Sequence, residues 1–161
     1  MAISLDSKAT KDLETIVANC VRLGRTDDPN FAAANAILAL RLTGEYNMEK
    51  TIKAICKRGK LRSFVCYKDI ADASGLNWVK SRRGVLPHLE ALSFYAAGKG
   101  WPLLSSIVVN KDKIETGDMT PDNLKGFLDG VREAGRDVDI EDVAFMKREQ
   151  QRVFAWCREE H

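Results

Sequence analysis

The sequence predicts a mainly α-helical fold with a small β component, in which a winged helix-turn-helix core follows an N-terminal helical hairpin. Three observations indicate this: apolar residues recur at helical spacing over residues 10–43, a helix, a glycine turn and a second helix follow each other over 66–84, and a β-branched run ends at Asn110. The chain of 161 residues suits one domain with a helical extension. We divide it into a hairpin over 1–46 and a winged-helix-like domain with C-terminal helices over 47–161.

The N-terminal hairpin is predicted from two amphipathic segments. From Leu13, apolar residues fall at i, i+3, i+4, i+7 and i+8, with Thr10 as the expected N-cap and Gly24 just beyond the helix end. Pro29 follows Asp28 at the start of a second helix. Because nothing titratable or nucleophilic gathers on this hairpin, we expect residues 10–43 to act as a scaffold, in self-association or in contact with a protein partner.

The middle of the chain consists of short segments separated by glycines. Asn47 and Asn77 are the expected N-caps of two helices, and Gly75 suits a turn that needs a positive φ. The predicted helices cover residues 48–57, 68–74, 77–84 and 87–98, with a β-prone segment over 63–67.

The C-terminal third begins with a predicted strand over 103–110, where β-branched residues are frequent. A polar loop over 111–120 then provides the natural place for a wing. Thr120-Pro121 is a strong helix start, and Gly135 marks the end of that helix. A last helix is expected from about Asp139.

Charge is distributed unevenly along the sequence. The net charge is +2, yet residues 48–83 hold ten Lys or Arg and three acids, a net of +7, while residues 111–161 hold nine basic and thirteen acidic residues, a net of −4. This polarity favours a face for a polyanion joined to an acidic remainder. The alternative is a lysine-rich helix face that is merely solvated.

The coincidence of the basic segment with the helix-turn-helix pattern favours a non-catalytic protein, regulatory or accessory, that binds double-stranded DNA. Trp78 could stack on a sugar or base, or simply pack its helix onto the core. The expected DNA-binding residues are Lys60, Arg62, Lys68, Asn77, Trp78, Lys80, Arg82, Arg83 and Lys111.

Two other functions compete with DNA binding. The near-neutral total charge also suits a protein interaction module, such as a small inhibitor or accessory factor of a mobile element. An enzyme would need a pocket, and an apolar cleft lined by Tyr67, Trp101, Ser105 and Ser106 would favour one.

The segment Tyr67-x-x-Ile70-Ala71-x-x-x-Gly75 resembles the DNA-binding domain of the alkyltransferase and alkyltransferase-like repair family. The resemblance implies a recognition helix carrying Arg82 or Arg83, and it extends to Pro102 and the Val108-Val109-Asn110 run. The family's reactive Cys and the adjoining His-Arg are replaced by Leu-Ser-Ser-Ile at 104–107. No nucleophile remains there, so the resemblance implies binding without alkyl transfer.

No other chemistry is indicated. The cysteines, Cys20, Cys56, Cys66 and Cys157, lack metal-ligand or redox spacing, and we expect free, buried thiols. His88 and His161 suggest no acid/base pair, so we expect no catalytic residue, metal site or cofactor. Residues 1–8 lack the pattern of a signal peptide, and no run is apolar enough to span a membrane. We expect a small cytoplasmic protein of bacterial type.

Overall fold

The structure, a computed structural model, describes residues 5–160, so Met1–Ser4 of the N-terminal stretch and the terminal His161 lie outside the described residues. The described chain is mainly helical, as the sequence predicts. Between residues 5 and 160 the strands are β1 (Val65–Cys66) and β2 (Val108–Val109). The helices are α1 (Thr10–Arg22), α2 (Pro29–Leu42), α3 (Met48–Gly59), α4 (Tyr67–Ala73), α5 (Trp78–Ser81), α6 (Val85–Lys99), α7 (Pro121–Glu133) and α8 (Asp142–Glu160), with 3-10 turns η1 (Leu5–Ser7), η2 (Arg82–Gly84), η3 (Leu104–Ile107) and η4 (Lys111–Lys113).

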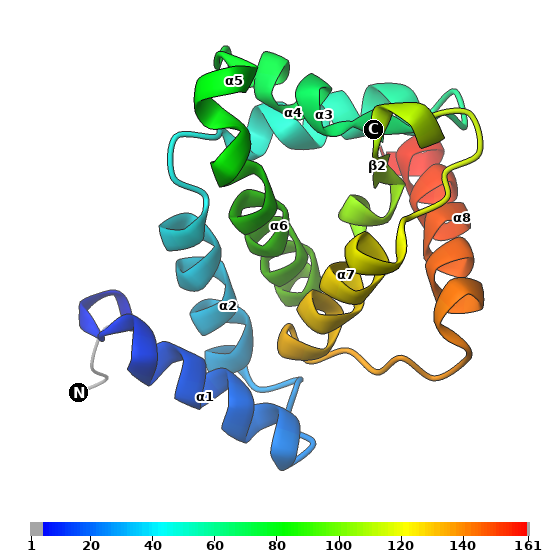
Figure 1. Ribbon diagram of the computed structural model, residues 1–161. Coiled ribbons are helices and arrows are strands. Elements are labelled where there is room, and N and C mark those ends of the chain that lie inside the picture. Colours follow the sequence, from blue (N-terminus) through cyan, green and yellow to red (C-terminus); the bar gives the residue numbers. More distant parts are fainter. Residues whose placement is uncertain (1–4, 161) are drawn as a thin grey trace.

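Helix α6 lies at the centre of the molecule (Figure 1). Residues on most of its circumference are buried, which is typical of a helix enclosed by other elements. Helix α2 lies along it at close range, because Gly98 has no side chain: a Cβ there would lie 3.3 Å from the carbonyl oxygen of Ala32. Helix α1 packs on the other side of α2 through Leu13, Val17 and Phe31. The helical hairpin therefore rests on α6.

The same hairpin also contacts the end of α7. Gly135 follows α7 with φ at +90°, and a Cβ added there would lie 2.5 Å from Cζ of Phe31 and 3.1 Å from Cγ2 of Val21. The turn at Gly135 thus needs glycine both for its backbone conformation and for the space it leaves. The division after residue 46 stays a prediction, while the packing joins the hairpin to both α6 and α7.

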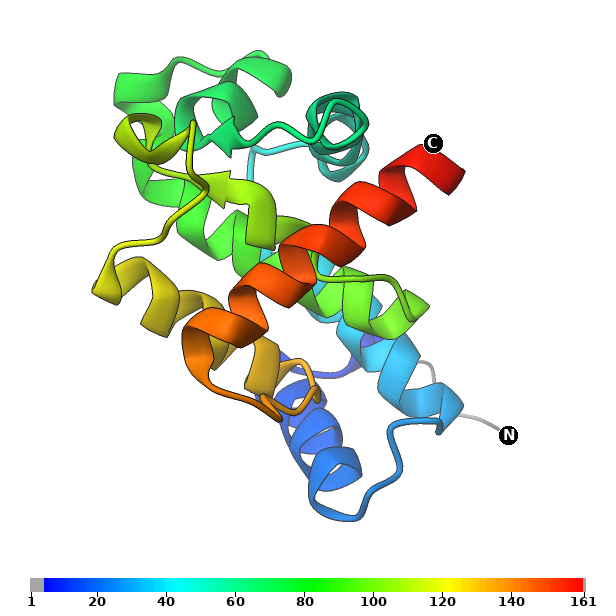
Figure 2. The same ribbon diagram turned by 90° about the vertical axis from the view of Figure 1, so that its right-hand side faces the viewer.

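Strands β1 and β2 pair in parallel, with Val65 opposite Val108 and Cys66 opposite Val109. Helix α8 crosses this part of the molecule (Figure 2) and packs on α3 and η3. Its buried Gln150 donates from Nε2 to the carbonyl oxygens of Ser106, at 3.0 Å, and Gly117, at 2.7 Å. One side chain of α8 therefore holds both η3 and the loop before α7.

Three local predictions were wrong. The predicted strand over 103–110 is a 3-10 turn followed by two strand residues, because Leu104 and Ile107 are apolar through burial in the core rather than through pairing. Ala9, not Thr10, is the N-cap of α1, and the Thr10 hydroxyl instead accepts from Arg41 Nη1 at 3.1 Å. The last helix begins at Asp142, since Asp139 pairs with Arg148 outside the helix.

Candidate nucleic-acid interface

Helices α4 and α5, with the turn between them, form the segment in which the sequence predicts a helix-turn-helix. Ile70 of α4 is fully buried and anchors the first helix to the core. Gly75 turns the chain with φ at +72°, a conformation that favours glycine. The Asn77 side-chain oxygen then accepts from the backbone amide of Lys80 at 3.1 Å and begins α5. Figure 1 places this segment at the end of the molecule far from α1.

The second helix is shorter than predicted. The sequence predicts a helix over 77–84, but α5 ends at Ser81 and the 3-10 turn η2 connects it directly to α6. The Tyr46 hydroxyl donates to the carbonyl oxygen of Ser81 at 2.9 Å, and the Tyr46 ring leaves only 3.3 Å to a Cβ placed at Gly84. Tyr46 therefore packs closely against the turn that follows α5.

Three cations of this segment are exposed. The charged side chains of Lys80, Arg82 and Arg83 make no hydrogen bond and no ion pair within residues 5–160; the bond of Lys80 to Asn77 comes from its backbone amide. Lys80 lies on α5, and Arg82 and Arg83 lie on the 3-10 turn that follows it. Val79, 75% exposed, and Leu86, 60% exposed, lie near Arg82 along the chain. Exposed apolar side chains therefore flank the cationic segment on both sides along the chain.

Trp78 and Asn77 serve the local fold. Trp78 is half-buried and packs against the main core, which is the packing alternative for this residue. Asn77 uses its side-chain oxygen in the cap described above. Both residues position the exposed cations that follow them.

Two of the predicted basic residues are engaged within the molecule. Arg62 has a positive φ of 55°, and its Nη2 donates to Oε1 of Gln151 at 2.8 Å. Its guanidinium carbon also lies 5.7 Å from the centroid of the Phe154 ring. Lys68 pairs with Asp72 one turn away, at 3.1 Å. These contacts tie Arg62 to α8 and reduce the charge that Lys68 offers to a ligand.

A second row of cations lies on α3. Lys53, Lys57 and Lys60, at i, i+4 and i+7, line an open groove of about 400 Å³. Lys53 pairs with Glu49 at 3.4 Å, whereas Lys57 and Lys60 have no such partner among the described residues. The predicted site omitted Lys57, although its helical spacing from Lys60 was a readable signal. The predicted Lys111 is exposed on η4, next to β2.

The acids of the C-terminal third do not neutralise this surface. Their ion pairs are made with basic residues of the same third, for example Lys147 with Asp118 at 3.3 Å and Lys125 with Asp129 at 2.9 Å. No ion pair joins them to the nine predicted residues in the part of the chain that the structure describes.

Cys66 and His88, whose side chains have the chemistry of a nucleophile and a base, are buried. Cys66 is 7% exposed, and burial raises the pKa of its thiol, so the buried reading of this cysteine is confirmed. His88 is fully buried between the hydroxyls of Thr43 and Thr51. Neither side chain is available to a substrate.

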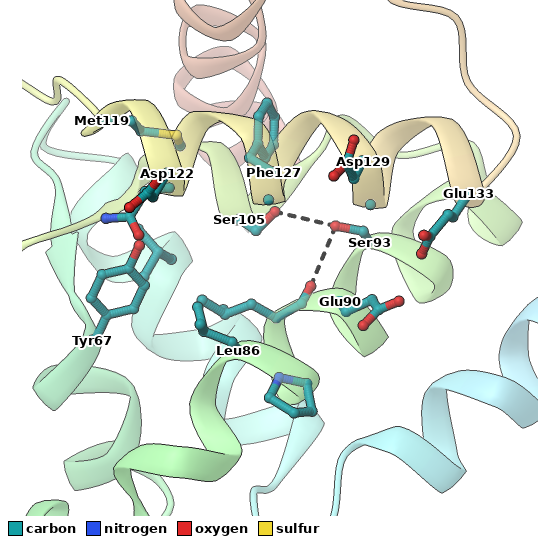
Figure 3. A pocket seen from close by; sticks show the side chains of 16 residues that line it. Tyr67, Leu86, Glu90, Ser93, Ser105, Met119, Asp122, Phe127, Asp129 and Glu133 are labelled. Carbon is teal, nitrogen blue, oxygen red and sulfur yellow. Dashed lines mark hydrogen bonds between the residues drawn. The ribbon is translucent and has the colours of Figure 1, made fainter.

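A cavity of about 360 Å³ lies between α6 and α7 (Figure 3). It brings together Tyr67 and Ser105 of the cleft that would favour an enzyme. Trp101 instead packs on Trp156, with ring centroids 4.9 Å apart. Ser106 is turned toward α8, where its carbonyl oxygen accepts from Gln150. The grouping expected for an enzyme is therefore not formed.

Within residues 5–160, no group of three His, Cys, Asp or Glu side chains is placed to hold a metal ion. No helix in that range has both the length and the apolar character needed to cross a membrane. The chain matches no protein-family model, no curated protein and no solved structure.

Proposed function

We propose that the protein is a non-catalytic DNA-binding protein, regulatory or accessory, that contacts duplex DNA through its α4–α5 helix-turn-helix and the adjoining basic surface. One observation carries the proposal: the charged groups of Lys80, Arg82 and Arg83, on and directly after α5, are exposed and make no ion pair within residues 5–160. Unpaired cations release counterions from DNA when they bind phosphates.

The shortness of α5 indicates which contacts dominate. A helix of four residues offers few side chains to base edges in a groove, whereas the cations around it reach phosphates. Lys57 on α3, Lys60 directly after it and Lys111 on η4 extend the phosphate-binding surface in this proposal, and the loop over 111–120 takes the place of a wing. We therefore expect binding that depends strongly on salt and weakly on sequence.

The proposal keeps the binding part of the resemblance to the alkyltransferase-like family and omits its chemistry. Tyr67, Ile70, Ala71 and Gly75 occupy α4 and the turn after it, where burial and a positive φ account for the last three. The 3-10 turn at 104–107 presents no thiol. Common ancestry with that family is part of the proposal.

The test measures duplex binding at two salt concentrations for the wild type and an Arg82→Ala/Arg83→Ala variant. Each lost phosphate contact lowers the slope of log affinity against log salt by about one, so we expect a decrease of about two and weaker binding for every sequence. A Lys11→Ala/Arg25→Ala variant, with the same change of charge on and after α1, is the control and should bind like the wild type. An unchanged slope in the Arg82/Arg83 variant would remove this surface as the binding site.

A protein interaction module is the second candidate, favoured by exposed apolar residues on the N-terminal hairpin. Leu23 and Leu40 are 52% and 67% exposed. Purification with and without nuclease separates the candidates: nucleic acid that accompanies the protein supports the first. A protein free of nucleic acid that self-associates, and dissociates in a Leu40→Lys variant, supports the second.

A further inference from the structure

The cavity between α6 and α7 has a defined polarity along its length (Figure 3). Tyr67, Met119 and Asp122 lie at one end, and Glu90 and Glu133 lie at the other. Apolar side chains form most of the wall between them, including Leu89, Val108 and Phe127. Its volume of about 360 Å³ falls in the range of small-molecule sites.

Two glycines in α7 open this cavity. Gly126 and Gly130 lie one helical turn apart, and both line it. Glycine in a helix interior is less favourable than alanine, so two glycines in one helix need a structural reason. A Cβ at Gly126 would meet nothing within 4 Å, and one at Gly130 would meet only Ser93 Oγ at 3.9 Å. Close packing therefore does not require them; they leave room in the wall.

The hydroxyls at the centre of the cavity offer an acceptor. Ser93, 4% exposed, donates from Oγ to the carbonyl oxygen of Leu89 at 3.3 Å. Ser105, 7% exposed, lies with its Oγ 3.3 Å from Ser93 Oγ. The single hydroxyl proton of Ser93 is used in the bond to Leu89. Ser105 therefore donates to Ser93, and the lone pairs of Ser105 Oγ stay available to accept a hydrogen bond. The floor of the cavity thus accepts a hydrogen bond and donates none.

All ionisable groups on the cavity wall other than Tyr67 are carboxyls: Glu90, Asp122, Asp129 and Glu133 line it, and no Lys, Arg or His does so among the described residues. Asp129 is neutralised by Lys125 at 2.9 Å. Burial, followed by the hydrogen bond and charge of Glu133 and the charge of Glu14, raises the pKa of Glu90 to about 7. The Glu90–Glu133 end therefore holds two carboxyls without a cation between them.

We propose that this cavity binds a monovalent organic cation, an amine on an apolar body, with the ammonium group at the carboxyls of Glu90 and Glu133 and the apolar body along Leu89, Val108 and Phe127. Acceptors at the floor and carboxylates at the end match an ammonium donor, while the apolar wall matches the carbon skeleton. The open space at Gly126 admits that skeleton. This inference is independent of DNA binding.

The proposal includes a dependence on pH. A cation between the carboxyls favours their ionised forms, so its binding releases the proton that Glu90 holds near neutral pH. The other charged groups facing this end are Glu14 and Arg22 of α1 and Arg132 of α7, which line the adjoining cavity with Glu90 and Glu133. We expect amine affinity to rise from pH 6 to pH 8 as Glu90 ionises.

The test uses 4-phenylbutylamine as the probe and 4-phenylbutanol as its uncharged counterpart, with binding followed by calorimetry and by the amide resonances of Gly126 and Gly130. We expect saturable amine binding that shifts both resonances, and alcohol binding at least about tenfold weaker. A Glu90→Gln/Glu133→Gln variant should bind the amine as weakly as the alcohol and lose the pH dependence. An Asp112→Asn variant, altered on the exposed η4 turn, should bind like the wild type.

A Gly126→Leu variant supplies the second arm, because its side chain fills the cavity while α7 gains a better helix former. It should remain folded, judged by its thermal transition, and bind neither probe. Equal affinity for amine and alcohol, amine binding that survives in Gly126→Leu, or no saturable amine binding up to about 10 mM would each overturn the proposal.

Discussion

In the centre of the fold, Nε2 of His88 lies 2.7 Å from the hydroxyl oxygen of Thr51. Its Nδ1 contacts the hydroxyl of Thr43, and its ring stacks on Tyr46 with centroids 4.8 Å apart. One neutral imidazole therefore joins α6 to α3 and to the end of α2. The hydroxyl of Tyr46 also donates to the carbonyl oxygen of Ser81, the last residue of α5. This buried cluster therefore contacts the segment that carries the basic surface.

Burial lowers the pKa of His88 from 6.5 to about 4, which makes stability depend on pH. Between pH 6.5 and pH 4 the histidine is protonated in the unfolded chain but stays neutral in the folded chain. The free energy of unfolding therefore falls as the pH is lowered from 6.5 to 4. The loss contributed by His88 is about 3 kcal/mol. Urea unfolding at pH 7 and pH 4.5 of the wild type and His88→Gln measures it. An equal loss in both proteins would contradict the assignment.

Glu90 has the opposite effect. Its folded pKa of about 7 lies above the ordinary value of 4.5, so the folded state binds the extra proton and loses stability as the pH rises through 7. Because Gln mimics the protonated carboxyl, Glu90→Gln should match the wild type at pH 5 and exceed it by about 1 kcal/mol at pH 8, the gain being reduced by solvent screening. Thermal unfolding at the two pH values gives the comparison. The variant should not be less stable than the wild type at pH 8.

Gly117 tests the loop that precedes α7. Its φ is +75°, and a Cβ there would lie 2.2 Å from the Phe64 ring, which itself packs edge-on against Phe154. We expect Gly117→Ala to cost about 3 kcal/mol, the sum of the left-handed backbone penalty and the displaced ring. Gly24→Ala is the matched control, since φ is +67° but nothing lies within 4 Å, and it should cost about 1 kcal/mol. Equal losses of stability in the two variants would show that the contact with Phe64 does not contribute to the cost.

Substitutions of Arg62 and Arg83 should distinguish an arginine that stabilises the fold from one that binds DNA. Arg62 is held by Gln151 and Phe154, whereas Arg83 has no side-chain partner within the described range. In duplex-binding measurements, Arg83→Ala should lower the salt slope by about one and leave the unfolding midpoint unchanged. Arg62→Ala should lower the midpoint and change the slope by less than about half as much. The reverse pattern would place the site near α8.

Helix starts were predictable from the sequence because a cap is a local interaction. Asp28, Asn47, Asn77 and Thr120 each accept a backbone amide two or three residues ahead, as their positions before apolar periodic segments indicated. Thr10 failed because Arg41, distant in the sequence, uses its hydroxyl. The β-branched run before Asn110 failed for a related reason, since burial alone accounts for its composition.

The predicted site was only partly readable in the same way. The exposure of Lys80, Arg82 and Arg83 follows from their place on a short helix and the turn after it, but the hydrogen bond of Arg62 is made to Gln151, 89 residues later in the chain. The cavity could not be predicted, because α4, α6, η3 and α7 each contribute part of its wall. Of its lining residues, only Tyr67 and Ser105 were named from the sequence as part of a possible cleft, and the two glycines of α7 were a further signal.

The parallel pairing of Val65 with Val108 has a consequence for the order of events during synthesis. The segment between β1, which ends at Cys66, and β2, which begins at Val108, includes α5. Bringing the two strands together closes this long loop, which costs conformational entropy. Helix α8, which packs on α3 and η3, is made later still. A ribosome-bound chain that stops short of Val109 therefore cannot complete this pairing, and the segment with Lys80, Arg82 and Arg83 is made before the strand that closes it.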